Sequence, residues 1–120
     1  MALVVTRTRI EETLLRHVEA FARGDLDAFM NDYCEQAVLI TPDGILRGRG
    51  EIRTFFEELL AAFLPGSTLE VSQCTTERTM AYIVWSGRSE HVDIPFATET
   101  FMVRDGKILT QTFTSQMHPR

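Results

Sequence analysis

The sequence predicts a single α+β domain over residues 1–120, with helices first and mostly antiparallel strands after them. Two patterns carry this prediction: helical periodicity is confined to the first half, and strand-like segments with turn signals fill the second. The length suits one domain with its own core. Hydrophobic residues are 44% and charged residues 24%, so disordered and collagen-like classes are excluded.

The periodicity predicts three helices. From about residue 8 to 23, an apolar stripe recurs at spacings of four, four and three, and acid–base pairs lie opposite it. A glycine then ends this helix, and Asp25 can cap a short second helix that runs to Tyr33. A third helix is expected after Gly50, and Pro65-Gly66 should stop it.

The strands are predicted from alternation and turn residues. Residues 37–41 form the first strand, and the turn at 41–44 leads into a short hairpin. Asp105-Gly106 is a two-residue hairpin turn. The later strands are expected over four segments: 68–77, 79–87, 92–104 and 107–117.

One strand has large apolar side chains on both of its faces. In residues 80–85 they alternate to both sides, whereas a sheet covered on one side should alternate apolar with polar residues. The outer face then either meets another subunit or exposes an apolar patch. We expect a homodimer through this face.

Charge and cysteine usage bear on partners and compartment. Seventeen acidic against 12 basic residues give a formal charge of −5, which argues against nucleic acid or anionic membrane as partners. Without a membrane span or a leader-like start, the expected compartment is the cytoplasm. Cys34 and Cys74 are expected to be reduced, buried small hydrophobes, and histidine spacing predicts no metal site.

The order of elements and three segments carry a family resemblance. The segments are Ala-Phe-Ala-Arg-Gly-Asp-Leu-Asp-Ala-Phe at 20–29, Gly-Arg-Gly-Glu-Ile at 48–52 and Glu-Thr-Phe-Met-Val-Arg-Asp-Gly-Lys-Ile at 99–108. Together they resemble the nuclear transport factor 2-like superfamily, in its SnoaL-like and ketosteroid-isomerase-like branch. The resemblance implies a cone: a strongly bent sheet wrapped around the N-terminal helix, enclosing an apolar pocket and dimerising through its outer face.

His17 is the first candidate catalytic residue. It borders the inward stripe of the first helix, where the resemblance implies an oxyanion donor, a tyrosine in the isomerases. A histidine can donate a hydrogen bond or act as an acid or base near neutral pH. The alternative is a core or rim histidine that is satisfied by a backbone carbonyl.

Glu99 is the second candidate. It shares one side of its strand with Phe101 and Val103, and desolvation there would raise its pKa and keep it protonated as a donor. The resemblance implies an aspartic acid with that role at this position. The alternative turns Glu99 to solvent and Thr98, Thr100 and Met102 inward.

A general base is missing where the resemblance places one. That position is Thr41, which cannot abstract a proton from carbon at neutral pH, so true ketosteroid isomerisation is not expected. Asp43 lies two residues further on and is the third catalytic candidate, although its Pro-Asp-Gly setting explains it as a turn residue.

The expected function is therefore broad. The chain is interpreted as a small-molecule-binding domain, and as an isomerase, dehydratase or cyclase that needs no cofactor and transfers protons on an apolar carbonyl-bearing or cyclic substrate. The alternative is a non-catalytic ligand-binding or dimeric adaptor domain. The residues expected to line the pocket are Thr41, Phe56, Tyr82, Trp85, Phe101 and Phe113.

Overall fold

The computed structural model describes residues 8–63 and 67–120 and confirms the α+β class. The described helices are α1 (Arg9–Arg23), α2 (Leu26–Met30) and α3 (Gly48–Phe63). The Thr8 hydroxyl caps α1 by accepting from the backbone N–H of Glu11, and Gly24 ends it in the left-handed conformation with φ 77°. Asp25 caps α2, as its position after the glycine predicts.

Two helix boundaries differ from the sequence prediction. The second helix ends at Met30 and not at Tyr33, because Tyr33 already pairs in the first strand. The third helix begins at Gly48, before Gly50. It is described as far as Phe63, and its predicted stop at Pro65-Gly66 lies outside the described residues. The N-terminal residues that bear on a leader, 1–7, also lie outside them.

Within the described residues, six strands form one open, mostly antiparallel sheet in the order β2-β1-β6-β5-β4-β3. Only the β1–β6 pair among these neighbours is parallel. Hairpins join β1 to β2, β3 to β4, β4 to β5 and β5 to β6. Asp105 and Gly106 turn the last of these with φ 52° and 75°, which confirms the predicted two-residue turn. The strands are β1 (Tyr33–Thr41), β2 (Gly44–Arg47), β3 (Thr68–Glu77), β4 (Met80–Arg88), β5 (Val92–Arg104) and β6 (Lys107–Pro119).

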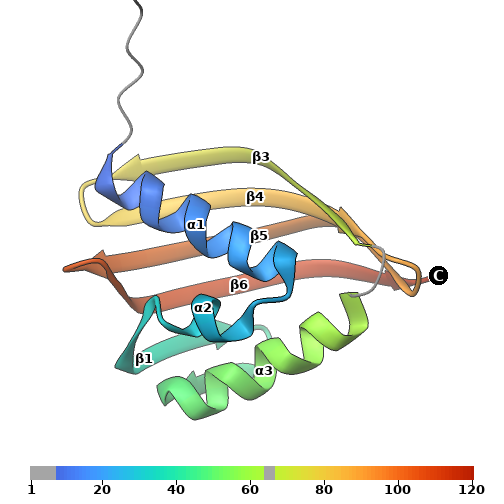
Figure 1. Cartoon of the computed structure of the whole chain (residues 1–120), viewed down its shortest axis with the longest axis horizontal. Helices are drawn as coiled ribbons and strands as arrows, with labels where there is room; N and C mark the ends of the chain where they lie inside the picture. The colour runs from blue at the N-terminus through green and yellow to red at the C-terminus, as the bar shows by residue number, and fades with distance from the viewer. Residues whose placement is uncertain (1–7, 64–66) are drawn as a thin grey trace, which may run out of the picture.

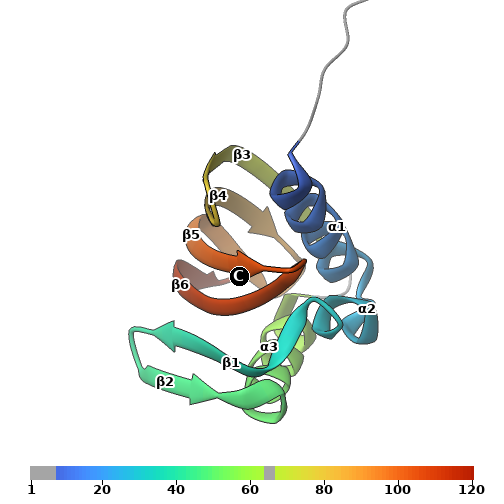
Figure 2. The same ribbon diagram turned by 90° about the vertical axis from the view of Figure 1, so that its left-hand side faces the viewer.

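The helices cover one face of this bent sheet. Figure 1 shows α1 lying across β3, β4 and β5, whereas α2 and α3 lie toward β1. The turned view in Figure 2 shows the long strands curving around the helical side. The core fills the space between the helices and the sheet and is rich in aromatic side chains, among them Phe21, Phe29, Phe56, Phe63 and Phe101.

The other face of the sheet is partly apolar and open. Met80, Tyr82, Phe96 and Met102 on β4 and β5 are each more than a third exposed, while Ile83 between them is buried. Large side chains thus point to both faces of β4, as the sequence predicts. Among the described helices, none is long and apolar enough to cross a membrane.

The cysteines are free, but one of them is not buried. Cys34 is half-buried beside the core, and Cys74 is exposed on β3. The expectation of a buried Cys74 is wrong because β3 is the edge strand of the sheet, farthest from β1.

Candidate functional site

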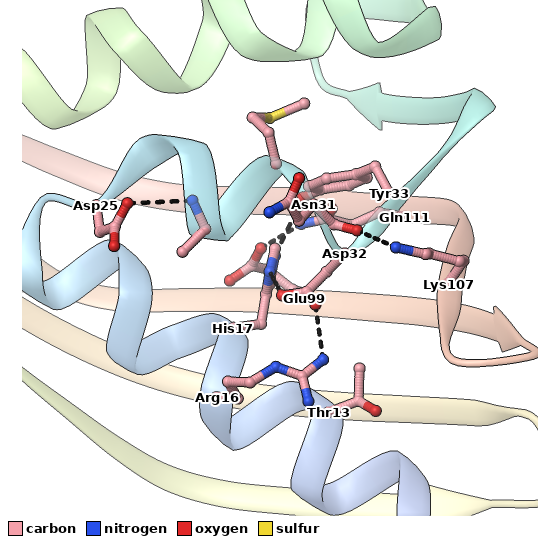
Figure 3. Close-up of polar contacts among 12 residues, drawn as sticks. Thr13, Arg16, His17, Asp25, Asn31, Asp32, Tyr33, Glu99, Lys107 and Gln111 are labelled. Carbon is pink, nitrogen blue, oxygen red and sulfur yellow. Dashed lines mark hydrogen bonds and ion pairs between the residues drawn. The ribbon is translucent and has the colours of Figure 1, made fainter.

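Five buried polar side chains form a continuous hydrogen-bonded chain beneath the helices (Figure 3). We call this the buried polar chain; its members are Asp32, His17, Tyr33, Gln111 and Glu99. It begins at the α2–β1 junction, crosses α1 and β1, and ends on the inner face of β5 and β6. Each link joins side chains from different elements, so only the tertiary fold brings them together.

His17 is buried on the inward face of α1, with 2% of its surface exposed. Its ring stacks on Phe29 with centroids 3.9 Å apart. Nδ1 lies 2.9 Å from Asp32 Oδ2, and Nε2 lies 3.3 Å from the hydroxyl of Tyr33. Burial lowers the pKa of His17, and the hydrogen bond with Asp32 offsets only part of that effect. Both ring nitrogens thus face side chains, and a hydrogen bond with the backbone of Phe29 also acts on the ring.

Asp32 orients the histidine. Its other oxygen accepts a hydrogen bond of 2.8 Å from Arg16, whose side chain is largely exposed. Burial alone would raise the pKa of Asp32, but the hydrogen bonds from His17 and Arg16 outweigh burial and lower it. An ionised Asp32 requires a proton on Nδ1 of His17, which leaves Nε2 as the nitrogen whose protonation can change.

Glu99 points inward. Ala97, Glu99, Phe101 and Val103 are buried in alternation along β5, which answers the question of orientation left open by the sequence. The indole of Trp85 donates to Oε2 at 2.7 Å, and the amide nitrogen of Gln111 donates to Oε1. Burial raises the pKa of Glu99 to about 7, and those two hydrogen bonds only partly oppose it. The carboxyl group of Glu99 can therefore be protonated near neutral pH.

Tyr33 and Gln111 connect the two titrating groups. The Tyr33 hydroxyl donates to Gln111 Oε1 at 2.5 Å. Burial, together with the nearby Glu99 and Asp32, raises the pKa of Tyr33 well above its usual value, so the phenol stays protonated. No buried side-chain polar atom within the described residues lacks a partner.

His17 and Glu99 line one small cavity of about 20 Å³, which has room for about one water molecule. These two residues are its polar wall. The other lining residues, all apolar or aromatic, are Val18, Phe21, Phe29, Phe56, Leu59, Leu69, Trp85 and Phe113. Three of the residues expected to line a pocket are thus found here: Phe56, Trp85 and Phe113.

Thr41 and Asp43 lie elsewhere. They line an open groove of about 430 Å³ at the β1–β2 turn, beside α3. Leu59 and Phe113 line both spaces, so these two side chains stand between the groove and the cavity. The sequence expectation that placed Thr41 in the same pocket as Trp85 does not describe this arrangement.

Two further expected lining residues are placed differently. Tyr82 is 37% exposed on the outer face of the sheet, because β4 alternates and its inward positions are Ala81, Ile83 and Trp85. The expectation that Tyr82 lines the cavity is therefore wrong. Phe101 is fully buried with its ring centroid 6.0 Å from that of His17, but it packs beside the histidine and not on the cavity wall.

Sequence reasoning missed Asp32, Tyr33 and Gln111. Extending the second helix to Tyr33 hid the first two, although their position just before an alternating strand was a signal. Gln111 was detectable as a polar residue two positions before Phe113, on the same face of β6. No cluster of three or more His, Cys, Asp or Glu side chains suited to a metal occurs in the described part of the chain.

The bent sheet, the covering helices and the acidic group on an apolar wall define a nuclear transport factor 2-like cone. Residues 14–111 match the SnoaL-like domain, and the chain belongs to that family. No curated protein sequence matches the chain significantly.

Solved structures show the same fold at low sequence identity. A nuclear transport factor 2-like protein of unknown function from Cytophaga hutchinsonii is 13% identical, with 95% of each chain covered and a TM-score of 0.75. A candidate ketosteroid isomerase from Kribbella flavida is 14% identical, covering 90% of this chain and 78% of that one, with a TM-score of 0.75. The epoxide hydrolase/cyclase-like enzyme SalBIII, which has a role in pyran ring formation in the polyether salinomycin, is 18% identical, with 88% and 89% covered and a TM-score of 0.76.

Proposed function

We propose that this chain binds an apolar, carbonyl-bearing or cyclic small molecule and transfers a proton to it from Glu99, as a cofactor-free isomerase, dehydratase or cyclase. The observation that carries the proposal is a carboxyl group, protonatable near neutral pH, on the wall of an otherwise apolar cavity. SnoaL-like domains bind small molecules, and the fold includes isomerases and cyclases. Both facts support this class of ligand.

Glu99 supplies the chemistry. In its protonated form it donates a hydrogen bond to a carbonyl or ether oxygen of the ligand, and in a dry apolar site that bond is stronger than in water. As negative charge develops on the oxygen, the proton follows it. Trp85 and Gln111 remain to donate to the resulting carboxylate.

His17 acts behind Glu99 in this proposal. Its two ring nitrogens face Asp32 and Tyr33, so it contributes through the buried polar chain and not by direct contact with the ligand. Asp43 is retained as a candidate base for the groove end of a ligand, because it lines that groove.

The ligand needs more room than this small cavity offers. Small-molecule sites usually enclose about 300–1,000 Å³, and the neighbouring groove alone falls in that range. Rotation of Phe113 or Leu59 would join the groove to the cavity, since these side chains line both. The ligand would then run from Asp43 at the surface to Glu99 inside.

A non-catalytic ligand-binding domain is the second candidate. Two observations favour it. Among the described residues that line the cavity, only His17 and Glu99 are polar, and Thr41 stands where the isomerases have their base. Binding without turnover would use the same carboxyl as a hydrogen-bond donor.

Ligand binding is the first test. We expect cyclic ketones and related lipophilic carbonyl compounds to raise the melting temperature of the wild-type protein. Glu99→Gln should weaken the binding of a hit at least about tenfold, because the amide is a weaker donor than the carboxylic acid. Glu90→Gln, an exposed glutamate in the β4–β5 loop, is the matched control and should bind normally.

Binding and product analysis together distinguish an enzyme from a non-catalytic binding domain. Equal binding by Glu99→Gln and wild type would remove Glu99 from the ligand site and contradict the proposal. Mass spectrometry of a bound hit after incubation then distinguishes the two activities: a rearranged, dehydrated or cyclised product identifies an enzyme, and an unchanged compound identifies a binder.

The homodimer is also part of the proposal. The exposed apolar side chains of β4 and β5 form a surface on the face opposite the helices, and a second copy of the chain is the partner that would cover it by symmetry.

A further inference from the structure

The hydrogen bonds of the buried polar chain have a direction that depends on where its protons lie. Each link joins one donor to one acceptor, and Tyr33 has a single hydroxyl proton to give. Gln111 differs from the other members because one end of its amide only donates and the other end only accepts. The orientation of that amide therefore has to agree with the charge of the groups on both sides.

With Glu99 ionised, the hydrogen bonds between His17 and Glu99 in the buried polar chain are all donated in the direction of the Glu99 carboxylate. Glu99 accepts from the amide nitrogen of Gln111, and the amide oxygen accepts from the Tyr33 hydroxyl. The Tyr33 oxygen can then only accept, so it requires a proton on Nε2 of His17. Nδ1 of the same ring already donates to Asp32, so His17 is a cation in this state.

With Glu99 protonated, the same links can run the other way. With no ligand in the site, the carboxylic acid donates to the amide oxygen of Gln111 once that amide has made half a turn about its last bond. The amide nitrogen then donates to Tyr33, and the Tyr33 hydroxyl donates to Nε2 of a neutral His17. The turned amide occupies the same space, since its oxygen and its amino group are nearly equal in size.

The two remaining combinations differ. If Glu99 and His17 are both protonated, a proton on Glu99 Oε2 leaves Oε1 to accept from Gln111, so every link keeps the direction it has with ionised Glu99. If neither is protonated, two acceptors meet between His17 and Tyr33. That arrangement leaves a buried polar group without a partner, which is strongly disfavoured.

We infer that Gln111 and Tyr33 couple the charges at the two ends of the buried polar chain: an ionised Glu99 requires a proton on Nε2 of His17, whereas a neutral Glu99 does not. Gln111 and Tyr33 are thus positioning residues that act on the charge of the group facing the ligand. This inference deepens the proposed function and takes its biological meaning from it, since Glu99 is the residue assigned to the ligand.

Other charged groups around the two ends keep their charge. Asp32 before β1 stays ionised, and its ion pair with Arg16 on α1 adds a constant field at His17. Tyr33 on β1 faces both ends and stays neutral. Glu99 is otherwise contacted by the uncharged Trp85 on β4 and Gln111 on β6. Burial favours neutral forms at both ends, which places the proton mainly on Glu99 at neutral pH.

A double-mutant cycle followed by nuclear magnetic resonance tests the coupling. In protein with isotope-labelled histidine, the His17 titration is recorded with and without Glu99→Gln, which mimics the permanently neutral carboxyl. We expect this substitution to lower the proton affinity of His17 at least about tenfold, equivalent to about one pKa unit. In a Gln111→Met background, the same substitution should change it less than about threefold.

A second variant and a control make the test independent of one substitution. Tyr33→Phe breaks the chain one link further on and should reduce the effect of Glu99→Gln in the same way. Trp85→Phe removes a donor to Glu99 outside the path to His17 and should leave the coupling intact. An undiminished effect in both the Gln111→Met and Tyr33→Phe backgrounds would show that the two groups interact only through space, and would overturn the inference.

The titrations are made without ligand. A protein that shows the coupling but binds no carbonyl compound would refute the proposed function alone. A protein that binds through Glu99 but shows no coupling would refute this inference alone.

Discussion

Glu99 is buried, accepts two hydrogen bonds from neutral donors and has no cationic partner among the described residues. Such an environment favours the protonated carboxyl, in contrast to Asp32, where Arg16 favours the ionised form. Asp32 and Glu99, the two ends of the buried polar chain, are thereby held in different protonation states. Two carboxyl groups whose pKa values are shifted in opposite directions are typical of sites that donate and accept protons at neutral pH.

The pH dependence of stability follows from these shifts. Glu99 has its pKa raised from 4.5 to about 7, so its favourable contribution is complete below 4.5 and is lost as the pH rises through about 7. His17 acts in the opposite sense, since its lowered pKa gives a contribution that is present above 6.5 and is lost as the pH falls.

Glu99→Gln should remove the first of these effects. Relative to wild type, the free energy of unfolding of the variant should rise by about 3 kcal/mol between about pH 5 and about pH 8, measured by urea denaturation. Glu90→Gln is the control and should follow the wild type at both pH values. A constant difference between Glu99→Gln and wild type would contradict a raised pKa.

At the scale of elements, most of the fold was predictable because its signals are local. The apolar stripe of α1, its glycine end and the Asp105-Gly106 turn are each encoded within a few residues. The α2–β1 boundary was misplaced, because Asn31-Asp32 is compatible with a helix until Tyr33 pairs with Ile108 on a distant strand. The site was harder for the same reason: Glu99 was found from alternation, whereas its link to His17 depends on three separate elements.

The contact between β4 and α3 depends on a residue without a side chain. A Cβ atom at Gly87 would lie 2.6 Å from the ring of Phe63, which is fully buried at the end of α3. The sheet register also shifts between Trp85 and Gly87. Gly87 thus allows the strand and the helix to approach closely.

Gly87→Ala should therefore destabilise the protein. We expect a loss of about 1–3 kcal/mol in the free energy of unfolding, because the new methyl group overlaps a ring that cannot leave the core. Gly50→Ala in α3 is the matched control: nothing lies within 4 Å of the added carbon, and the substitution should be neutral or stabilising. Equal effects of the two changes in denaturant titrations would contradict the close contact.

For the whole molecule, the open face of the sheet predicts association. We expect the wild-type protein to sediment as a dimer and Tyr82→Lys as a monomer, because a charge in the apolar surface of β4 and β5 would be buried without a partner. Thr54→Lys, on an exposed position of α3, should leave the dimer intact. A wild-type protein that sediments as a monomer would refute this part of the proposal.

The position of β6 in the sheet has a consequence for synthesis of the chain. β6 follows the other five strands in sequence, yet it lies between β1 and β5 and is the strand that joins β2-β1 to β5-β4-β3. During translation, the strands of β2-β1 and of β5-β4-β3 therefore leave the ribosome before β6, the strand that pairs with both groups. Because β6 also carries Gln111, a nascent chain cannot connect His17 to Glu99 until β6 is in place. We expect folding to be completed late and to be limited by this long-range pairing.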